Sequence, residues 1–126
     1  MTVKRGEIYW VDFDPSRGSE QAGRRPALVV QNDVGNANSS TTVVVAITRT
    51  VPKKAYPFAV VVDPSASGLP SISTINCAQI LTLQQAGPQS RLLPPPGEQT
   101  LRPIGRLSSD KMAEVDRALK YNLGLE

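Results

Sequence analysis

The strongest constraint on the fold is a succession of short strand patterns separated by turn residues. Residues 7–13 alternate in polarity, residues 26–31 form an apolar run that begins at a proline, and residues 41–48 are rich in β-branched side chains. These patterns are typical of half-buried and buried strands. Further strands are predicted at 56–62, 73–77 and 79–83. Five or six short strands with frequent turns predict a mainly β protein, built as a small barrel or a strongly curled sheet.

The last part of the chain has a helical period instead. Ser109 is a suitable N-cap, and Gly124 lies near the expected end of the helix. The apolar residues between them recur at helical spacing and are Met112, Val115, Leu119 and Leu123. We therefore expect one amphipathic helix packed on the sheet. A length of 126 residues suits a single domain, residues 1–126.

Three stretches between these elements are predicted to be surface connections. Residues 16–25 and 35–40 contain glycine, polar residues and no large apolar run, as exposed loops do. Residues 85–97 contain four prolines and two glycines, and three of the prolines are consecutive. Consecutive prolines favour extended backbone and exclude a helix interior, so we interpret this stretch as a proline-rich surface segment.

The sequence contains no histidine and one cysteine. These counts exclude, within one chain, a histidine-based catalytic triad, a histidine-containing zinc site, an intrachain disulfide and a thiolate cluster. The sequence also has neither a phosphate-binding glycine motif nor carboxylates at a magnesium-binding spacing, so we expect no metal and no cofactor. Cys77 lies within a strand pattern and is interpreted as a buried structural thiol.

The sequence also bears on where the protein acts. No apolar stretch approaches the roughly 20 residues of a membrane span, and the first residues lack the apolar part of a signal peptide. We therefore expect a soluble, cytoplasmic protein without a membrane partner.

Positive charge is concentrated between residues 17 and 54. Of the 14 basic and 11 acidic residues of the chain, six and two lie in this region. The six are Arg17, Arg24, Arg25, Arg49, Lys53 and Lys54. A basic region suits a polyanionic ligand, either nucleic acid or an acidic protein segment, and it is also compatible with an ordinary solvated surface.

Several residues of this basic region are candidates for phosphate or base binding. The guanidinium of Arg24 or Arg25 suits phosphate oxygens, while a salt bridge to Glu20 is the structural alternative. The Thr48 hydroxyl could donate to a phosphate oxygen, or Thr48 could be an ordinary strand residue. Tyr56, which follows two lysines, could stack on a base, whereas most other aromatic residues have core spacing.

Three blocks near the N-terminus carry a family resemblance. They are RGEIYWVDFDP at 5–15, GSEQAG at 18–23 and RPALVV at 25–30. Together they resemble the MazF/PemK-type toxin endoribonucleases of bacterial toxin–antitoxin systems. Supporting matches occur at Thr48, at 56–58, at 76–80 and in the final helix. The resemblance implies a small SH3-like curled barrel of the MazF/CcdB/Kid type, a homodimer, and metal-independent cleavage of single-stranded RNA at short sequence motifs.

The resemblance also assigns roles to individual residues. It places the catalytic arginine on Arg25 and the catalytic threonine on Thr48. RNA-binding positions fall on Gly18, Ser19, Gln21, Arg49, Lys53, Lys54, Tyr56 and Gln79, and we add Arg24 for its guanidinium beside Arg25. Cleavage would proceed by attack of the RNA 2′-hydroxyl on the adjacent phosphorus, leaving a 2′,3′-cyclic phosphate and a 5′-hydroxyl. Because a guanidinium is a poor base near neutral pH, we expect Glu20 to be the base or a loop-ordering partner.

The family pattern implies one further partner and leaves two other functions open. The partner is a MazE-like antitoxin with an acidic, disordered tail that covers the basic groove. The sequence departs from the pattern at Leu81, where the family often has a basic residue, and at 85–97, which looks like an insertion. The alternatives are a toxin of the same fold that poisons DNA gyrase and a non-catalytic RNA-binding module.

Overall fold

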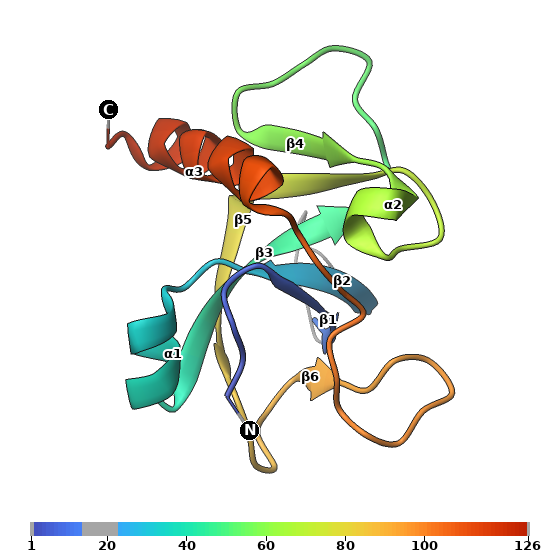
Figure 1. Cartoon of the computed structure of the whole chain (residues 1–126), viewed down its shortest axis with the longest axis vertical. Coiled ribbons are helices and arrows are strands. Elements are labelled where there is room, and N and C mark those ends of the chain that lie inside the picture. Colours follow the sequence, from blue (N-terminus) through green and yellow to red (C-terminus); the bar gives the residue numbers. More distant parts are fainter. Residues whose placement is uncertain (1, 14–22, 126) are drawn as a thin grey trace.

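The computed structural model describes residues 2–13 and 23–125, and within these ranges it shows a curled, seven-stranded antiparallel sheet with a C-terminal helix (Figure 1). The strand order is β4-β5-β3-β2-β1-β6, and β7 pairs with β1. The strands are β1 (Glu7–Asp12), β2 (Arg24–Val29), β3 (Thr41–Thr48), β4 (Ala59–Val62), β5 (Ser73–Gln84), β6 (Leu92–Leu93) and β7 (Gly105–Arg106). The helices are α1 (Asp33–Asn38), α2 (Pro64–Ser67) and α3 (Ser109–Leu123). The predicted fold class is confirmed.

Alternation along the strands separates two apolar clusters. On one face of the sheet, which we call the α3 face, Ile8, Leu28 and Ile47 pack with Val115 of α3. On the opposite face, Val11, Ala27, Val29, Val44 and Ala46 pack with Phe13, Leu83 and Leu92. Because successive strand residues point to opposite faces, these clusters identify the face of every neighbouring strand residue.

Strand β2 starts two residues earlier than the sequence predicted. Pro26 was expected to open it, but Arg24 and Arg25 already pair with Asp12 and Val11 of β1. On its other side, pairing of β2 with β3 stops at Ala27. Pro26 has no N–H to donate to a ladder, and it is tolerated inside the strand because the ladder with β3 has already ended there. Both arginines are therefore strand residues rather than loop residues.

Strand β5 replaces the two strands that were predicted at 73–77 and 79–83. It runs over 12 residues, but its register against β3 shifts midway, because Val45 pairs with Ile80 and the next residue, Ala46, pairs with Asn76. The shift leaves residues 77–79 without partners on β3. Bulges of this kind bend a strand and increase its twist, so the shift accompanies the curl of the sheet. Strand β4 begins at Ala59, three residues later than predicted.

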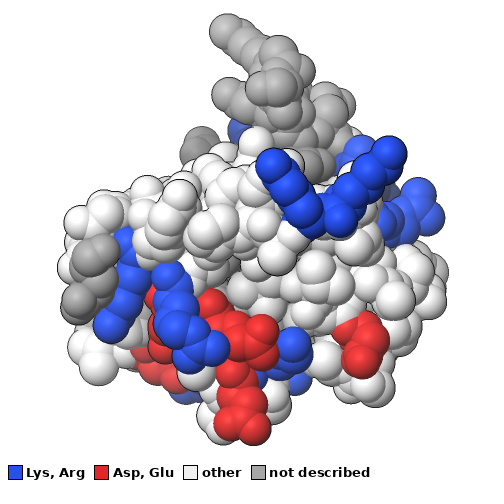
Figure 2. All heavy atoms as spheres, turned by 90° about the horizontal axis from the view of Figure 1, so that it is seen from above, with Lys and Arg blue, Asp and Glu red and all other residues white. Residues whose placement is uncertain are grey.

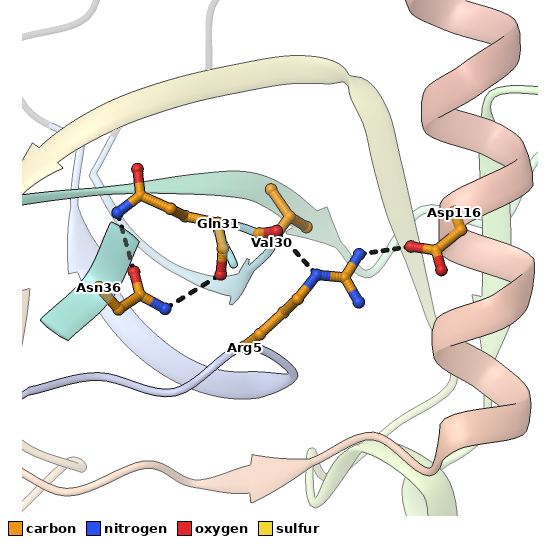
Figure 3. Close-up of polar contacts among 5 residues, drawn as sticks. All are labelled: Arg5, Val30, Gln31, Asn36 and Asp116. Carbon is orange, nitrogen blue, oxygen red and sulfur yellow. Dashed lines mark hydrogen bonds and ion pairs between the residues drawn. The ribbon is translucent and has the colours of Figure 1, made fainter. Parts of the chain in front are cut away.

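Helix α1 occupies the stretch that was predicted to be a loop. Asn32 caps it, since its side-chain oxygen accepts from the Gly35 N–H at 2.7 Å. The buried Asn36 side chain donates to the Gln31 carbonyl at 3.0 Å (Figure 3). It also accepts from the Thr42 hydroxyl at 2.7 Å. These bonds explain a helix in a sequence with little intrinsic helix propensity. The short helix α2, capped by Asp63, was not predicted either.

Helix α3 confirms the predicted C-terminal helix with small corrections. Its N-cap is Ser108 rather than Ser109, and Gly124 ends it in the left-handed conformation. Met112 and Val115 are buried as expected, but Leu123 is exposed. The N-terminal segment is tied to the helix, since Arg5 forms an ion pair with Asp116 and also donates to the Val30 carbonyl at 2.9 Å (Figure 3).

Cys77 is buried on the α3 face, as predicted. Burial raises the pKa of its thiol to about 11, so the thiol is protonated at neutral pH.

Candidate active site

The two residues expected to be catalytic lie on neighbouring strands. The β2–β3 register pairs Ala27 with Ala46. Continued by two residues along each strand, that register aligns Arg25 with Thr48. Arg25 and Thr48 lie two residues from Ala27 and Ala46 of the apolar cluster opposite α3, so both belong to the face opposite the α3 face. This extension of the register puts Arg25 and Thr48, both half-buried residues, at the same end of the same face.

Local hydrogen bonding orients the Thr48 hydroxyl. Its oxygen accepts from the Thr50 N–H at 3.2 Å. A hydroxyl has one hydrogen and two lone pairs, so this bond uses an acceptor position and leaves the hydrogen to donate. A donor beside a guanidinium is the combination that a phosphate with developing negative charge requires.

Thr74 continues the row of polar side chains on this face. It pairs directly with Thr48 across the β3–β5 ladder and is 4% exposed. Its hydroxyl oxygen is buried and has no hydrogen-bond partner among the described residues. Buried hydroxyls are normally satisfied, so Thr74 carries an uncompensated polar group next to Thr48.

A pocket of about 240 Å³ opens on the α3 face at the same end of the sheet. Its apolar lining residues are Trp10, Pro26, Ile47, Leu69 and Pro70, and its polar lining residues are Arg24, Arg25, Arg49, Ser71 and Ser73. The pocket lies where the β2–β3 ladder has ended beside Pro26. It is smaller than the roughly 300–1,000 Å³ of ordinary ligand pockets, so its size suits one flat ring or one phosphate group.

The structure therefore brings together three of the predicted basic residues, since Arg24, Arg25 and Arg49 all line this pocket. By strand alternation Arg24 lies on the α3 face, whereas Arg25 belongs to the face of Thr48 and borders the pocket from the neighbouring position of β2. Arg49 follows β3 and joins Arg24 at the pocket.

The loop that contains Lys53, Lys54 and Tyr56 is less closely connected to these three arginines. The Lys54 ammonium lies 5.4 Å from the centre of the Tyr56 ring, and Tyr56 stacks on Phe58 with ring centres 5.3 Å apart. Tyr56 lines a different hollow, next to Arg117 and Tyr121 of α3. Lys53 is exposed in the same loop. Tyr56 thus lies beside α3 and does not line the pocket with Arg24, Arg25 and Arg49, which we call the arginine pocket.

Of the remaining predicted residues, one lies in the bulge of β5 and four lie outside the residues that the structure describes. Gln79 is half-buried within the bulge of β5, and it does not line the arginine pocket. Gly18, Ser19, Glu20 and Gln21 lie outside the residues that the structure describes.

Charge is distributed unevenly over the surface. In Figure 2, one group of Lys and Arg side chains lies at the upper right without acidic neighbours, whereas the Asp and Glu side chains lie in the lower half, where other Lys and Arg side chains are interspersed with them. Among residues 2–13 and 23–125, no group of three or more Cys, Asp or Glu side chains is arranged to hold a metal ion. None of the helices in these ranges has the length and apolar character needed to cross a bilayer.

Sequence reasoning missed several residues of this region. Thr74, Ser71 and Ser73 reach it only through the β3–β5 pairing and the connection after α2. Most aromatic residues other than Tyr56 were expected to have core positions, yet Trp10 is half-buried and lines the pocket. Strand alternation could have indicated this position of Trp10, because Trp10 lies on the same face of the sheet as its partner Pro26.

Comparison with known proteins adds a family to this geometry. A family model described as "PemK-like, MazF-like toxin of type II toxin-antitoxin system" matches residues 4–123. Endoribonuclease EndoA of Bacillus subtilis (strain 168) is 38% identical over 125 residues, which cover 99% of this chain and 97% of that protein.

Solved structures agree with this family. A crystal structure of MazF from Deinococcus radiodurans matches with a TM-score of 0.73 and 26% identity, covering 98% of both chains. A chain in a crystal structure of MazE-MazF from the same organism matches with a TM-score of 0.70 and 25% identity, covering 100% of this chain and 99% of that one.

Proposed function

The chain belongs to the PemK-like, MazF-like toxins of type II toxin–antitoxin systems, and we propose that it is a sequence-specific, metal-independent endoribonuclease that cleaves single-stranded RNA in the cytoplasm. The observation that carries this proposal is the β2–β3 register, which pairs Ala27 with Ala46 and, continued by two residues, aligns Arg25 with Thr48. The name of the 38% identical relative, an endoribonuclease, supports the reaction class.

The chemistry uses the RNA's own nucleophile. The ribose 2′-oxygen forms a bond to phosphorus while the bond from phosphorus to the 5′-oxygen breaks, which leaves a 2′,3′-cyclic phosphate and a 5′-hydroxyl. The 2′-hydroxyl proton goes to a base and the 5′-oxygen gains a proton. These steps need charge stabilisation and two proton transfers, which side chains can supply.

Arg25 and Thr48 provide the charge stabilisation. The guanidinium binds the non-bridging phosphate oxygens, and the Thr48 hydroxyl donates to the same phosphate, where negative charge increases in the transition state. Loss of a comparable preorganised donor lowers catalytic rates by roughly 10²–10³-fold. Arg25 also has a proton that it can share with the leaving 5′-oxygen.

Glu20 is our candidate for the base. A carboxylate accepts a proton from the 2′-hydroxyl far more readily than a guanidinium, whose pKa is above about 12. Base contacts are assigned to Gly18, Ser19, Gln21 and Gln79 and to the loop with Lys53, Lys54 and Tyr56, because unstacked RNA exposes base edges and faces.

The active protein is proposed to be a homodimer that a cognate antitoxin inhibits. Exposed apolar side chains, among them Leu123 at 54% exposure, support self-association. The acidic tail of a MazE-like antitoxin would cover the same basic residues as RNA, and the MazE-MazF structure of a relative supports such a partner. Sedimentation equilibrium should give twice the chain mass of 13.5 kDa.

One assay tests the activity. Purified protein is incubated with a long RNA in EDTA and the ends are mapped. We expect cuts at a recurrent motif with cyclic phosphate ends. Arg25→Ala and Thr48→Val should each slow cleavage roughly 100-fold or more. Thr82→Val, the same threonine substitution at an exposed position of β5, should not.

Other outcomes identify other functions. Bound but intact RNA would indicate a binding module, and intact RNA with inhibited DNA supercoiling would indicate a gyrase poison. If Glu20→Gln leaves the single-turnover rate unchanged across pH, Glu20 is not the base.

A further inference from the structure

The proline-rich segment brings one more arginine to the end of the sheet. Strand β6 lies within this segment, and its Leu92 pairs with Val11 of β1. The Asp12 N–H donates to the Arg91 carbonyl at 2.9 Å, which continues the same pairing by one residue. Arg91 is therefore held next to Asp12, although 79 positions of sequence separate them.

The face on which Arg91 lies follows from its neighbours. Leu92 is buried in the apolar cluster opposite α3. Because strand residues alternate, Arg91 belongs to the α3 face, together with Asp12 and its partner Arg24. The β2–β3 register, continued in the same way, aligns Arg24 with Arg49.

These positions form a row across four strands, which we call the arginine row: Arg91, Asp12, Arg24 and Arg49. Neighbouring strands are 4.7–4.9 Å apart, so the row extends about 14 Å along the sheet. It carries three positive charges and one negative charge. Two of its members, Arg24 and Arg49, line the same pocket as Arg25. A strand of RNA with its cut phosphate at Arg25 can therefore reach the row through this pocket.

We propose that Arg91 binds the phosphate backbone of RNA beside the cut site, as the outer member of the arginine row. This inference rests on the proposed function only for the identity of the polyanion. Arg91 is exposed and makes no ion pair among the described residues. Single-stranded nucleic acid is commonly held by positive grooves that follow its backbone, and arginine donors match phosphate oxygens.

A second arginine of the same region provides a matched control. Arg102 is also exposed, but its guanidinium is paired with the Glu98 carboxylate through bonds of 2.7 and 2.6 Å. Its charge is already compensated by a partner on the same segment. Removing Arg102 should therefore not change RNA binding, whereas removing Arg91 should.

The test measures binding without cleavage. A labelled 2′-O-methyl RNA oligonucleotide, which lacks the attacking hydroxyl, is titrated with full-length protein at salt concentrations from about 50 to 300 mM, and anisotropy gives the affinity. For single strands each neutralised phosphate contributes about 0.7 to the slope of log affinity against log salt. Arg91→Ala should lower the slope by about 0.7, equivalent to roughly five-fold weaker binding at 0.1 M salt.

Two further variants separate charge from structure. Arg91→Lys should keep most of the slope, since it keeps the charge, and Arg102→Ala should match the wild-type protein. Fluorescence of Trp10, the only tryptophan, reports RNA binding independently, because Trp10 lines the pocket beside Arg24. An unchanged slope for Arg91→Ala, or an equal loss for Arg102→Ala, would overturn the inference.

The outcome also separates this inference from the proposed function. If the wild-type protein cleaves RNA and the slope does not depend on Arg91, the inference fails and the nuclease function stands. If the protein binds RNA through Arg91 but never cleaves it, the nuclease function fails and the arginine row stands.

Discussion

The uncompensated hydroxyl of Thr74 leads to a prediction about stability whose sign is unusual. Thr74→Val exchanges the hydroxyl for a methyl group of similar size at a position that is 4% exposed. A buried hydroxyl without a hydrogen bond costs roughly 1–3 kcal/mol in proteins. Because this hydroxyl oxygen has no partner among the described residues, Thr74→Val should raise the free energy of unfolding by about 1–2 kcal/mol. For a chain of this size, each kcal/mol shifts the melting temperature by about 4 °C.

The neighbouring strand offers the same substitution with the opposite expected sign. Thr42 is fully buried, but its hydroxyl donates to the Asn36 side-chain oxygen at 2.7 Å. Thr42→Val should therefore lower the free energy of unfolding by about 1–2 kcal/mol. Both variants and the wild-type protein are compared by thermal and urea unfolding, followed by circular dichroism. If the two variants shift stability in the same direction, or if Thr74→Val destabilises the fold, the reasoning from hydrogen-bond satisfaction is refuted.

Four further predictions address packing, reactivity and pH. Gly105→Ala should destabilise the protein by more than about 3 kcal/mol in urea unfolding, because the new Cβ would lie 2.0 Å from the Ser67 carbonyl oxygen; an unchanged midpoint would contradict this contact. Cys77 should resist iodoacetamide at neutral pH and react only after unfolding, since burial raises the pKa of its thiol to about 11; mass spectrometry distinguishes the two cases. The hydrogen bond from the Arg5 backbone N–H lowers the pKa of Asp33 below that of the unfolded chain, so Asp33 stabilises the fold above its ordinary pKa. That contribution is lost as pH falls below about 4, and Asp33→Asn should flatten the acid side of the stability curve measured by melting temperature. The rate of RNA cleavage should show no inflection near pH 6.5, since the chain has no histidine; a clear inflection there would require another titrating group.

Local sequence patterns predicted much of the sheet, because strand alternation is a local property. Strand β3 was predicted with its observed bounds, and α3 was predicted apart from its cap. Helix α1 was missed, because the bonds from Asn36 to Gln31 and Thr42 that stabilise it depend on strands already being in place. Propensity within a window of sequence contains no such information.

In the candidate site, too, some features were predicted from the sequence and others depend on how the strands pair. A resemblance assigned roles to Arg25 and Thr48, but only the pairing of the strands gives the face that they share. Pro26 was read as the start of a strand, whereas in the structure it marks the end of the ladder with β3 and the position of a pocket. Arg91 had no local signal at all, because its neighbourhood is set by the pairing of β6 with β1.

The polar contacts around α1 have a consequence for how such a protein can diverge. They fix the connection between β2 and β3 at the end of these strands that lies opposite Arg25 and Thr48, on the order of 20 Å away by strand length. Since the register is set at that distant end, the loops beside the two residues can gain, lose or exchange residues without altering which side chains stand opposite each other. Substrate preference can therefore change by loop variation while the chemistry stays constant, and a search for variants with new RNA targets should randomise these loops and leave Gln31, Asn36 and Thr42 untouched.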